Sequence, residues 1–271
     1  PSSPREASVA NKPRRKWTLR RKVLFCLLLV LDVVLIGAAL WFWFDRMGQE
    51  QTVADQVTQA QTHVEAGTAD TPPKVDWAAL KAENPDVCAW VQIPGTPVNF
   101  PVYQGETNDT YLRTGADGNY SLGGLIFIDS QNTGPDLTDQ QTMVYGHHIN
   151  SQDPASSMFA WIDTYNDQQV FDEHPLVWWV TEQQTWRLTP LYSYVLPETD
   201  HMEVPLSWPT EQEFRDYLRH DLSIAETSRP DADAVIDATD RVLTLVTCNY
   251  DKYGRGRTLV VCVPQQTVDE A

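Results

Sequence analysis

The chain has 271 residues, of which 20 are Lys or Arg and 37 are Asp or Glu, so its formal net charge is −17. This acidic balance excludes a general nucleic-acid binder, which needs a basic surface for the phosphates. With 42% apolar and 10% aromatic residues the chain is too hydrophobic to be wholly disordered, and four cysteines are too few for a disulfide-dense scaffold. The charge is also uneven: residues 1–45 hold eight basic and three acidic side chains, which leaves 12 basic and 34 acidic ones, a net charge of −22, in residues 46–271.

The first predicted element is an apolar run of 22 residues, Val23–Phe44, whose one ionisable side chain is Asp32. As a helix it would extend roughly 33 Å, enough to cross a hydrocarbon core of about 30 Å. A basic segment, residues 1–22, precedes it, and the positive-inside rule therefore places the N-terminus in the cytoplasm. The rival interpretation is a cleaved signal peptide, but the run is longer than a signal core and no A-x-A site follows it. We expect a single-pass plasma-membrane protein with everything after residue 44 outside.

Residues 45–75 are expected to form an extracellular stalk, because they are rich in Gln, Thr and Ala and close with two prolines. Val53, Val57, Ala60 and Val64 recur at spacings of three and four residues, which predicts a partly helical stalk. The apolar stripe is thin, so we expect it to pack only weakly against the following domain.

A domain rich in β-strands is predicted over residues 76–271. It begins with a short helix capped by Asp76 and stopped by Pro85, and a second helix is predicted within 208–222 behind Pro209. The remaining pattern predicts a mainly β sandwich or closed barrel with peripheral helices. No phosphate-binding glycine loop and no metal-type Cys/His spacing is present in the sequence, so we expect neither a cofactor nor a metal. The eight strand candidates are VCAWVQI, VNFPVYQ, GGLIFID, QTMVYGH, LVWWVTE, TWRLTPLYSYVL, RVLTLVTC and RTLVVCV.

Cysteine chemistry is indicated by an odd count outside the apolar run. Cys26 lies in that run, which leaves Cys88, Cys248 and Cys262, so at least one outer thiol has no partner within the chain. Cys248 ends a β-branched strand and precedes the polar loop NYDKYGRG, a position typical of catalytic groups. Cys88 and Cys262 are interpreted as small buried side chains, and a bridge between them stays open.

A cysteine nucleophile reacts as the thiolate and needs a base or a cationic neighbour, and acyl transfer needs a donor for the oxyanion. Arg257 opens the strand after Cys248, so a hairpin would bring its guanidinium beside the thiol. His147 and His148 end an earlier strand and supply a candidate base.

These residues resemble the sortases, cysteine transpeptidases of Gram-positive cell surfaces. The nucleophile motif TLxTC followed by Arg is similar to Thr244–Cys248 and Arg257, and a histidine motif close to YGHN is similar to Tyr145–His148. Three further stretches resemble the sequences of class B sortases, at Asn84–Val102, Gly123–Asp129 and Ser157–Phe159. The resemblance covers about residues 76–263, in the family's order, and it implies the sortase β-barrel.

Carried over residue by residue, the resemblance implies that His147 is the catalytic histidine, Cys248 the nucleophile and Arg257 the catalytic arginine. His148 stands where the family often has Asn, and Arg255 shares the strand parity of Arg257, but Arg257 directly precedes the apolar run, as in the family. As weaker candidates, Thr247, His148 and Asp251 are expected around the oxyanion or the substrate.

The implied reaction cleaves a C-terminal sorting motif after Thr through a Cys248 thioester. The implied partners are secreted proteins with an NPxTN-like or LPxTG-like signal, and an amine from a peptidoglycan precursor or a pilin. One alternative is an extracellular cysteine peptidase or cell-wall hydrolase, although in papain-like enzymes the cysteine usually precedes the histidine. The other is a non-catalytic membrane-tethered binding domain that would use Trp178, Trp179 and Trp186, which we expect in the core and barrel wall instead.

Overall fold

The computed structural model describes residues 18–149, 157–197, 204–249 and 256–267. The chain divides into two compact units, residues 1–47 and residues 48–271. The second unit holds the sheet and the cleft described below.

The described part of the first unit is the beginning of one long helix, α1 (Leu19–Gln61), which contains the predicted apolar run. The whole stretch lacks proline, so no residue removes a helical hydrogen bond. An 18-residue window of α1 has a mean hydropathy of 2.9, and none of its residues is buried inside the protein. Within the described part of the chain, α1 is the one helix long and apolar enough to cross a membrane.

The last turns of α1 belong to the second unit and pack into it. Val53 and Val57 are 1% and 7% exposed and join the main hydrophobic cluster, and Ala60 is buried nearby. Their spacing of four and three residues brings all three to one face of the helix. The Gln61 side chain adds a hydrogen bond of 2.9 Å from its Nε2 to the Asn99 carbonyl. The structure thus differs from the expected weakly packed stalk, because this short apolar stripe completes the core.

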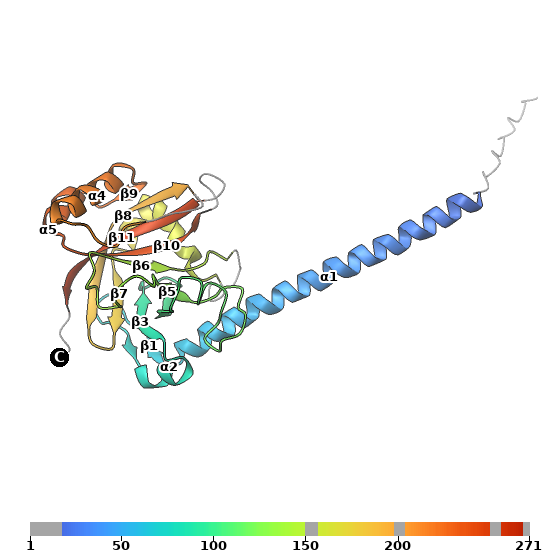
Figure 1. The fold of residues 1–271 in the computed structure, drawn as a ribbon, viewed down its shortest axis with the longest axis horizontal. Helices are drawn as coiled ribbons and strands as arrows, with labels where there is room; N and C mark the ends of the chain where they lie inside the picture. Colours follow the sequence, from blue (N-terminus) through green and yellow to red (C-terminus); the bar gives the residue numbers. More distant parts are fainter. Residues whose placement is uncertain (1–17, 150–156, 198–203, 250–255, 268–271) are drawn as a thin grey trace, which may run out of the picture. The chain divides into compact units, whose positions relative to one another are not determined.

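The second unit is built on a closed β-barrel (Figure 1). Each of the eight predicted strands is present, and the barrel order is β11-β10-β6-β5-β4-β3-β7-β8, closed by pairing of β8 with β11. The pairs β4–β5 and β6–β10 are parallel, whereas the other barrel pairs are antiparallel. The bounds are β3 (Val87–Gln92), β4 (Asn99–Tyr103), β5 (Ile126–Ile128), β6 (Gln141–Tyr145), β7 (Val177–Thr181), β8 (Thr185–Pro197), β10 (Val242–Asn249) and β11 (Gly256–Thr267).

Burial on both faces explains why most of these strands lack polar alternation in the sequence. The neighbours Trp178 and Trp179 in β7 point to opposite faces, yet they are 1% and 0% exposed. Trp186 in β8 is 8% exposed. The tryptophans that a binding domain would present to a ligand are therefore part of the core and wall, as the sequence predicts.

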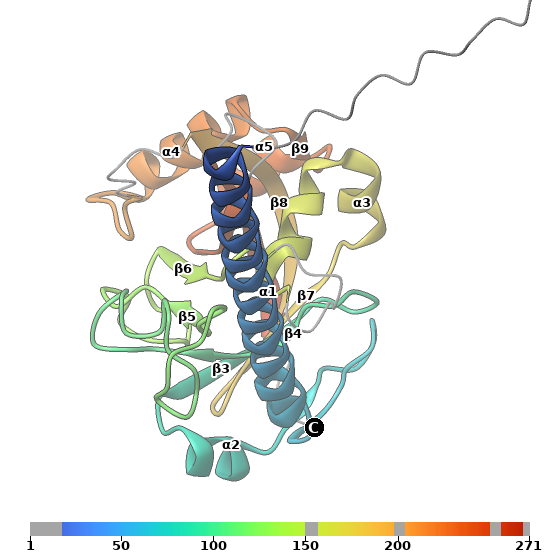
Figure 2. The same ribbon diagram turned by 90° about the vertical axis from the view of Figure 1, so that its right-hand side faces the viewer.

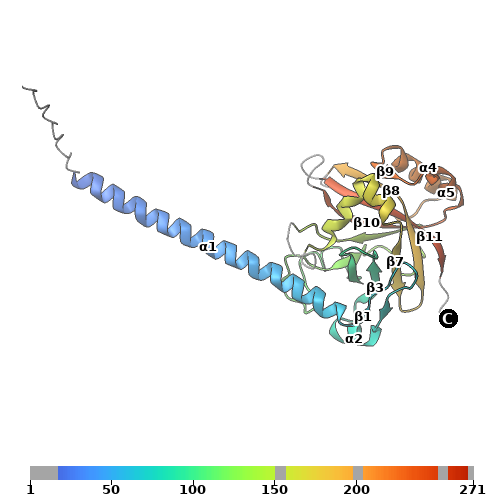
Figure 3. The ribbon, with the colours of Figure 1, turned by 180° about the vertical axis from the view of Figure 1, so that it is seen from behind.

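Helices cover the outside of the barrel. The predicted cap is present, since Asp76 accepts a hydrogen bond of 3.0 Å from Ala79 N at α2 (Trp77–Glu83). The second predicted helix is α4 (Glu211–Ser223), and its N-cap, which was not predicted, is Thr210. The helix α5 (Ala232–Ala238) lies beside α4, α4 packs against β8, and the short strand β9 (Thr227–Ser228) pairs with β8 (Figure 3).

Several short elements give no clear signal in the sequence. The 3-10 helix η1 (Phe159–Asn166) is followed by α3 (Gln168–Glu173), which lies beside β9 (Figure 2). A two-stranded sheet pairs β1 (Val64–Glu65) with β2 (Lys74–Val75). Such elements are too short to show a periodicity, and tertiary contacts therefore decide them.

Candidate active site

Three barrel strands bring the predicted site residues to one edge. The parallel strands β6 and β10 pair Tyr145 with Val246, and the Gly146 amide continues the ladder with a 3.0 Å hydrogen bond to the Val246 carbonyl. Their carboxyl ends therefore meet, with His147 and Cys248 each two residues beyond that pair. In the antiparallel hairpin of β10 and β11, Cys248 lies directly opposite Arg257. The expected hairpin is therefore present, and its two facing residues Cys248 and Arg257 line one cleft.

An open cleft of about 280 Å³ lies at this edge. It is lined by all three predicted residues together with Thr247, and by further residues that sequence reasoning missed. The missed residues are Asn108, Asp109, Leu112 and Phe127. The remaining lining residues, Tyr145, Gly146 and Val246, belong to the histidine and cysteine motifs. Asn108, Asp109 and Leu112 come from the connection between β4 and β5, where no periodic pattern marks them as site residues.

His147 is held by a backbone contact of its imidazole. Its Nε2 lies 2.8 Å from the Leu112 carbonyl oxygen. Because a carbonyl oxygen only accepts, Nε2 must carry the proton of the neutral imidazole. Nδ1 then has no proton and is the nitrogen that can accept one. Burial lowers the pKa of His147 and the positive charges of Arg113 and Arg257 lower it further, whereas the bond to Leu112 opposes them. The imidazole is therefore kept neutral over a wider pH range and can accept a proton.

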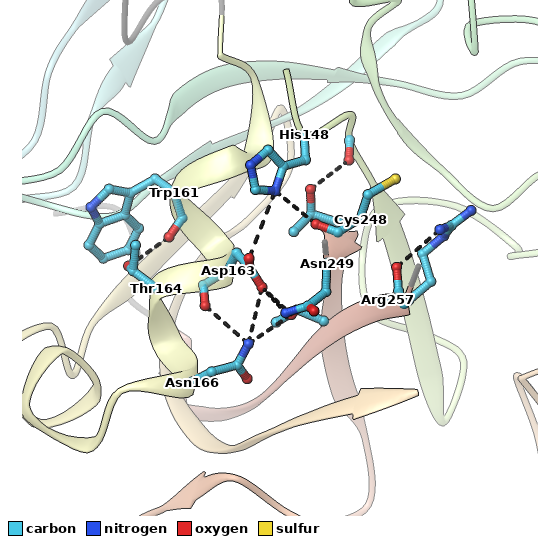
Figure 4. Close-up of polar contacts among 12 residues, drawn as sticks. His148, Trp161, Asp163, Thr164, Asn166, Cys248, Asn249 and Arg257 are labelled. Atoms are coloured by element: carbon cyan, nitrogen blue, oxygen red, sulfur yellow. Dashed lines mark hydrogen bonds and ion pairs between the residues drawn. The ribbon is translucent and has the colours of Figure 1, made fainter. Parts of the chain in front are cut away.

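The neighbours of His147 and Cys248 make structural contacts. The Thr247 hydroxyl, in a side chain 1% exposed, donates a 3.1 Å hydrogen bond to the Gly146 carbonyl and so ties β10 to the end of β6. The His148 Nδ1 lies 2.8 Å from the Cys248 carbonyl oxygen and 3.9 Å from Asp163 Oδ2 (Figure 4). The described residues that line the cleft include His147 but not His148. Asp251 and Arg255 lie outside the described residues.

The other cysteines have different surroundings. All four are free thiols, so Cys88 and Cys262 are not bridged. Burial, with the nearby charges of Asp136 and Asp86, raises the pKa of Cys88 to about 12, and burial alone raises the pKa of Cys262. Both therefore resist ionisation.

Metal ligation has no support in the described ranges. Across residues 18–149, 157–197, 204–249 and 256–267, no group of three or more His, Cys, Asp or Glu side chains is arranged to hold a metal ion.

Fold and site together define a β-barrel protein with a cysteine, a histidine and an arginine at one cleft, and known proteins share this architecture. No protein-family model matches the chain. Sortase B of Listeria monocytogenes serovar 1/2a is 26% identical over 240 residues, covering 85% of this chain and 93% of its own length. The X-ray structure of Clostridium perfringens sortase B is 30% identical with a TM-score of 0.61, and the match covers 71% of this chain and 99% of that one. A Staphylococcus aureus sortase B–substrate complex shares the fold with a TM-score of 0.62 at 20% identity, over 84% of this chain and 98% of that one.

The chain belongs to the class B sortases. It is therefore a cysteine transpeptidase, and the sequence-based resemblance is confirmed.

Proposed function

We propose that this sortase is a membrane-anchored enzyme that cleaves a C-terminal sorting motif after Thr and transfers the protein to an amine of a peptidoglycan precursor or a pilin. The observation that carries the proposal is the alignment of Cys248 with Arg257 beside His147 in one cleft. Nucleophile, oxyanion donor and base are the groups that this acyl transfer needs.

In the first half-reaction, His147 takes the thiol proton and the Cys248 sulfur bonds to the carbonyl carbon of the motif Thr. The tetrahedral oxyanion is stabilised by the Arg257 guanidinium, whose charge is fixed. The C–N bond then breaks, and His147 delivers its proton to the leaving amine. The products are a thioester on Cys248 and a released C-terminal peptide.

In the second half-reaction, the acceptor amine attacks the thioester carbonyl and loses a proton to His147. The C–S bond breaks, the sulfur regains a proton, and a new amide joins the two proteins. The neutral imidazole favoured by burial suits this base step.

The anchor in this proposal is residues 23–44 within α1, with residues 1–22 in the cytoplasm and the catalytic domain outside. It is supported by the mean hydropathy of 2.9 in α1 and by the basic cluster before it. The sorting motif is NPxTN-like or LPxTG-like, and the acceptor is a cell-wall or pilin amine.

The test uses the full chain in detergent micelles with a panel of fluorogenic NPxTN-like and LPxTG-like peptides. We expect cleavage of one motif class after Thr, a ligated product when a glycine-type amine is added, and a hydroxamate when hydroxylamine intercepts the thioester. Cys88→Ala is the matched control and keeps this activity. Hydrolysis without transfer to any amine would indicate a peptidase, and undiminished turnover by Cys248→Ala would refute the mechanism.

A further inference from the structure

One carboxylate lies behind the cleft and contacts two barrel strands. Asp163 belongs to η1, and its side chain is 12% exposed. Its Oδ1 accepts hydrogen bonds from Asn249 Nδ2 at 2.7 Å, from Asn166 Nδ2 at 3.1 Å and from the Thr258 hydroxyl (Figure 4). Its Oδ2 lies 3.9 Å from His148 Nδ1. A carboxylate with so many donors is held in one orientation.

Three of these partners each directly follow a predicted catalytic residue in the sequence. His148 follows His147, Asn249 follows Cys248, and Thr258 follows Arg257. Successive side chains of a strand point to opposite faces, so a residue that follows a cleft residue faces the interior side. Asn249 and Thr258 are accordingly 4% and 0% exposed.

The cleft side chains are directed away from this carboxylate. Figure 4 shows the sulfur of Cys248 and the guanidinium of Arg257 turned away from Asp163. The contacts of Asp163 thus reach the residue that follows each cleft residue, Asn249 after Cys248 and Thr258 after Arg257.

The network is anchored in the core on its other side. Asn166 donates from Nδ2 to the Thr258 hydroxyl oxygen at 2.8 Å, and its Oδ1 accepts a 2.7 Å hydrogen bond from Ser193 in β8. Phe159 in η1 is 0% exposed, and its amide donates a 2.8 Å hydrogen bond to the His147 carbonyl. The carboxylate thus rests on a packed element that also contacts the histidine segment.

Such a support matters where the regular ladder ends. The described β6–β10 ladder stops at the Gly146 amide bond, so His147 lies beyond it. The remaining links between the histidine segment and Cys248 include the His148 contact with the Cys248 carbonyl, next to Asp163. A displacement of about 1 Å between reacting groups can reduce the rate about 100-fold.

We propose that Asp163 is a positioning residue of this sortase: it fixes His147, Cys248 and Arg257 relative to one another through the residues that follow them. The proposal rests on the function proposed above for these three residues. Loss of the carboxylate loosens the reacting groups without removing any of them, so the expected effect is on kcat and not on KM.

The experiment compares Asp163→Ala and Asp163→Asn with wild type in the full chain. We expect Asp163→Ala to lower kcat about 100-fold with KM within about twofold. Asp163→Asn keeps an acceptor oxygen toward Asn249 and Thr258 and is expected to recover at least tenfold of that loss. The matched control is Asp167→Ala, which removes the N-cap of α3 and not a contact of this network, and kcat should stay within about twofold.

A double-mutant cycle with Thr258→Val separates positioning from general destabilisation. Because the Thr258 hydroxyl donates directly to Asp163 and both side chains belong to one hydrogen-bond network, their effects on kcat should be clearly less than additive. The inference is overturned if Asp163→Ala keeps kcat within twofold, if the loss falls on KM, or if Asp163→Asn recovers nothing. It is also overturned if partial unfolding explains the whole loss. In that case kcat of Asp163→Ala would equal the wild-type value at a temperature where circular dichroism shows the variant fully folded.

A measurement that needs no sorting peptide distinguishes failure of the proposed function from failure of the inference about Asp163. If wild type cleaves no sorting peptide, that function fails, and Asp163 is judged by iodoacetamide alkylation of Cys248, located by peptide mapping. Asp163→Ala should then change the pH profile of the alkylation rate, while Asp167→Ala should not. An unchanged profile in Asp163→Ala would overturn the inference in that case.

Discussion

The hairpin of β10 and β11 carries two cysteines in opposite surroundings. Cys262 pairs with Leu243 inside the hairpin, is 0% exposed, and has its pKa raised by burial. Cys248 lies toward the other end of the same hairpin, opposite Arg257, and lines the cleft. A thiol reacts as its thiolate, which an apolar interior disfavours and a nearby cation favours. Position along the strand therefore separates a buried cysteine from the one proposed as the nucleophile.

The same contrast holds for the two adjacent histidines. His147 lines the cleft with its Nε2 on the Leu112 carbonyl, whereas His148 holds the Cys248 carbonyl on the side of Asp163. His147 therefore lies on the cleft side and His148 on the Asp163 side, although both are half-buried.

The largest expected effect is on peptide turnover and concerns Cys248, the cysteine that lines the cleft. Cys248→Ala removes the proposed nucleophile, so turnover of a sorting peptide should fall below detection, while Cys262→Ala should retain most of it. Continuous fluorescence assays of both variants measure this difference. Equal losses in the two variants would show that the hairpin position does not decide reactivity.

His147→Ala and Arg257→Ala come next. Loss of the acid–base group should cost about 10²–10⁴-fold in kcat, and loss of the oxyanion donor about 10²–10³-fold. His148→Ala should cost less than His147→Ala, because its side chain contacts the backbone of Cys248 and supports the cleft without lining it. Steady-state kinetics on one peptide decides the matter, and a larger loss in His148→Ala than in His147→Ala would reverse the assignment.

A smaller effect concerns pH. Burial lowers the pKa of His147 from its ordinary 6.5, so the unfolded chain binds this proton at a higher pH than the folded chain does. Stability therefore falls as the pH drops through about 6.5 toward the folded value, and His147→Gln should reduce that fall in urea titrations. The acidic limb of kcat/KM should have its midpoint below 6.5, because the neutral imidazole is the base. A midpoint above 6.5 would contradict this assignment.

The smallest expected effect is on stability and concerns Cys262, the buried cysteine of the hairpin. Cys262→Ala leaves a small void in the main cluster and should lower the free energy of unfolding by about 1 kcal/mol, comparable to one buried methylene. Urea denaturation measures it. The exposed Thr58→Ala in α1 serves as the control, with a change below about 0.5 kcal/mol. A Cys262→Ala variant as stable as wild type would show that the sulfur adds nothing to the packing.

Much of this molecule follows from local patterns in the sequence. All eight barrel strands, the caps at Asp76 and Thr210 and the apolar run Val23–Phe44 depend on neighbouring residues, and short-range chemistry specifies each of them. The strand-end positions of Cys248 and Arg257 were predictable as well, because a hairpin fixes the register of its two strands.

Tertiary structure alone decided the features that join distant segments. Closure of the barrel by β8 and β11, burial of Val53 and Val57 in the core, and the Asn108 side of the cleft all depend on contacts across the fold. Asp163 is the clearest case, since a single Asp in a short 3-10 helix has no pattern that could reveal its role. The sequence by itself therefore determined the chemistry and the strands that carry it, because both are encoded locally. The packing of distant elements determined what surrounds and supports that chemistry.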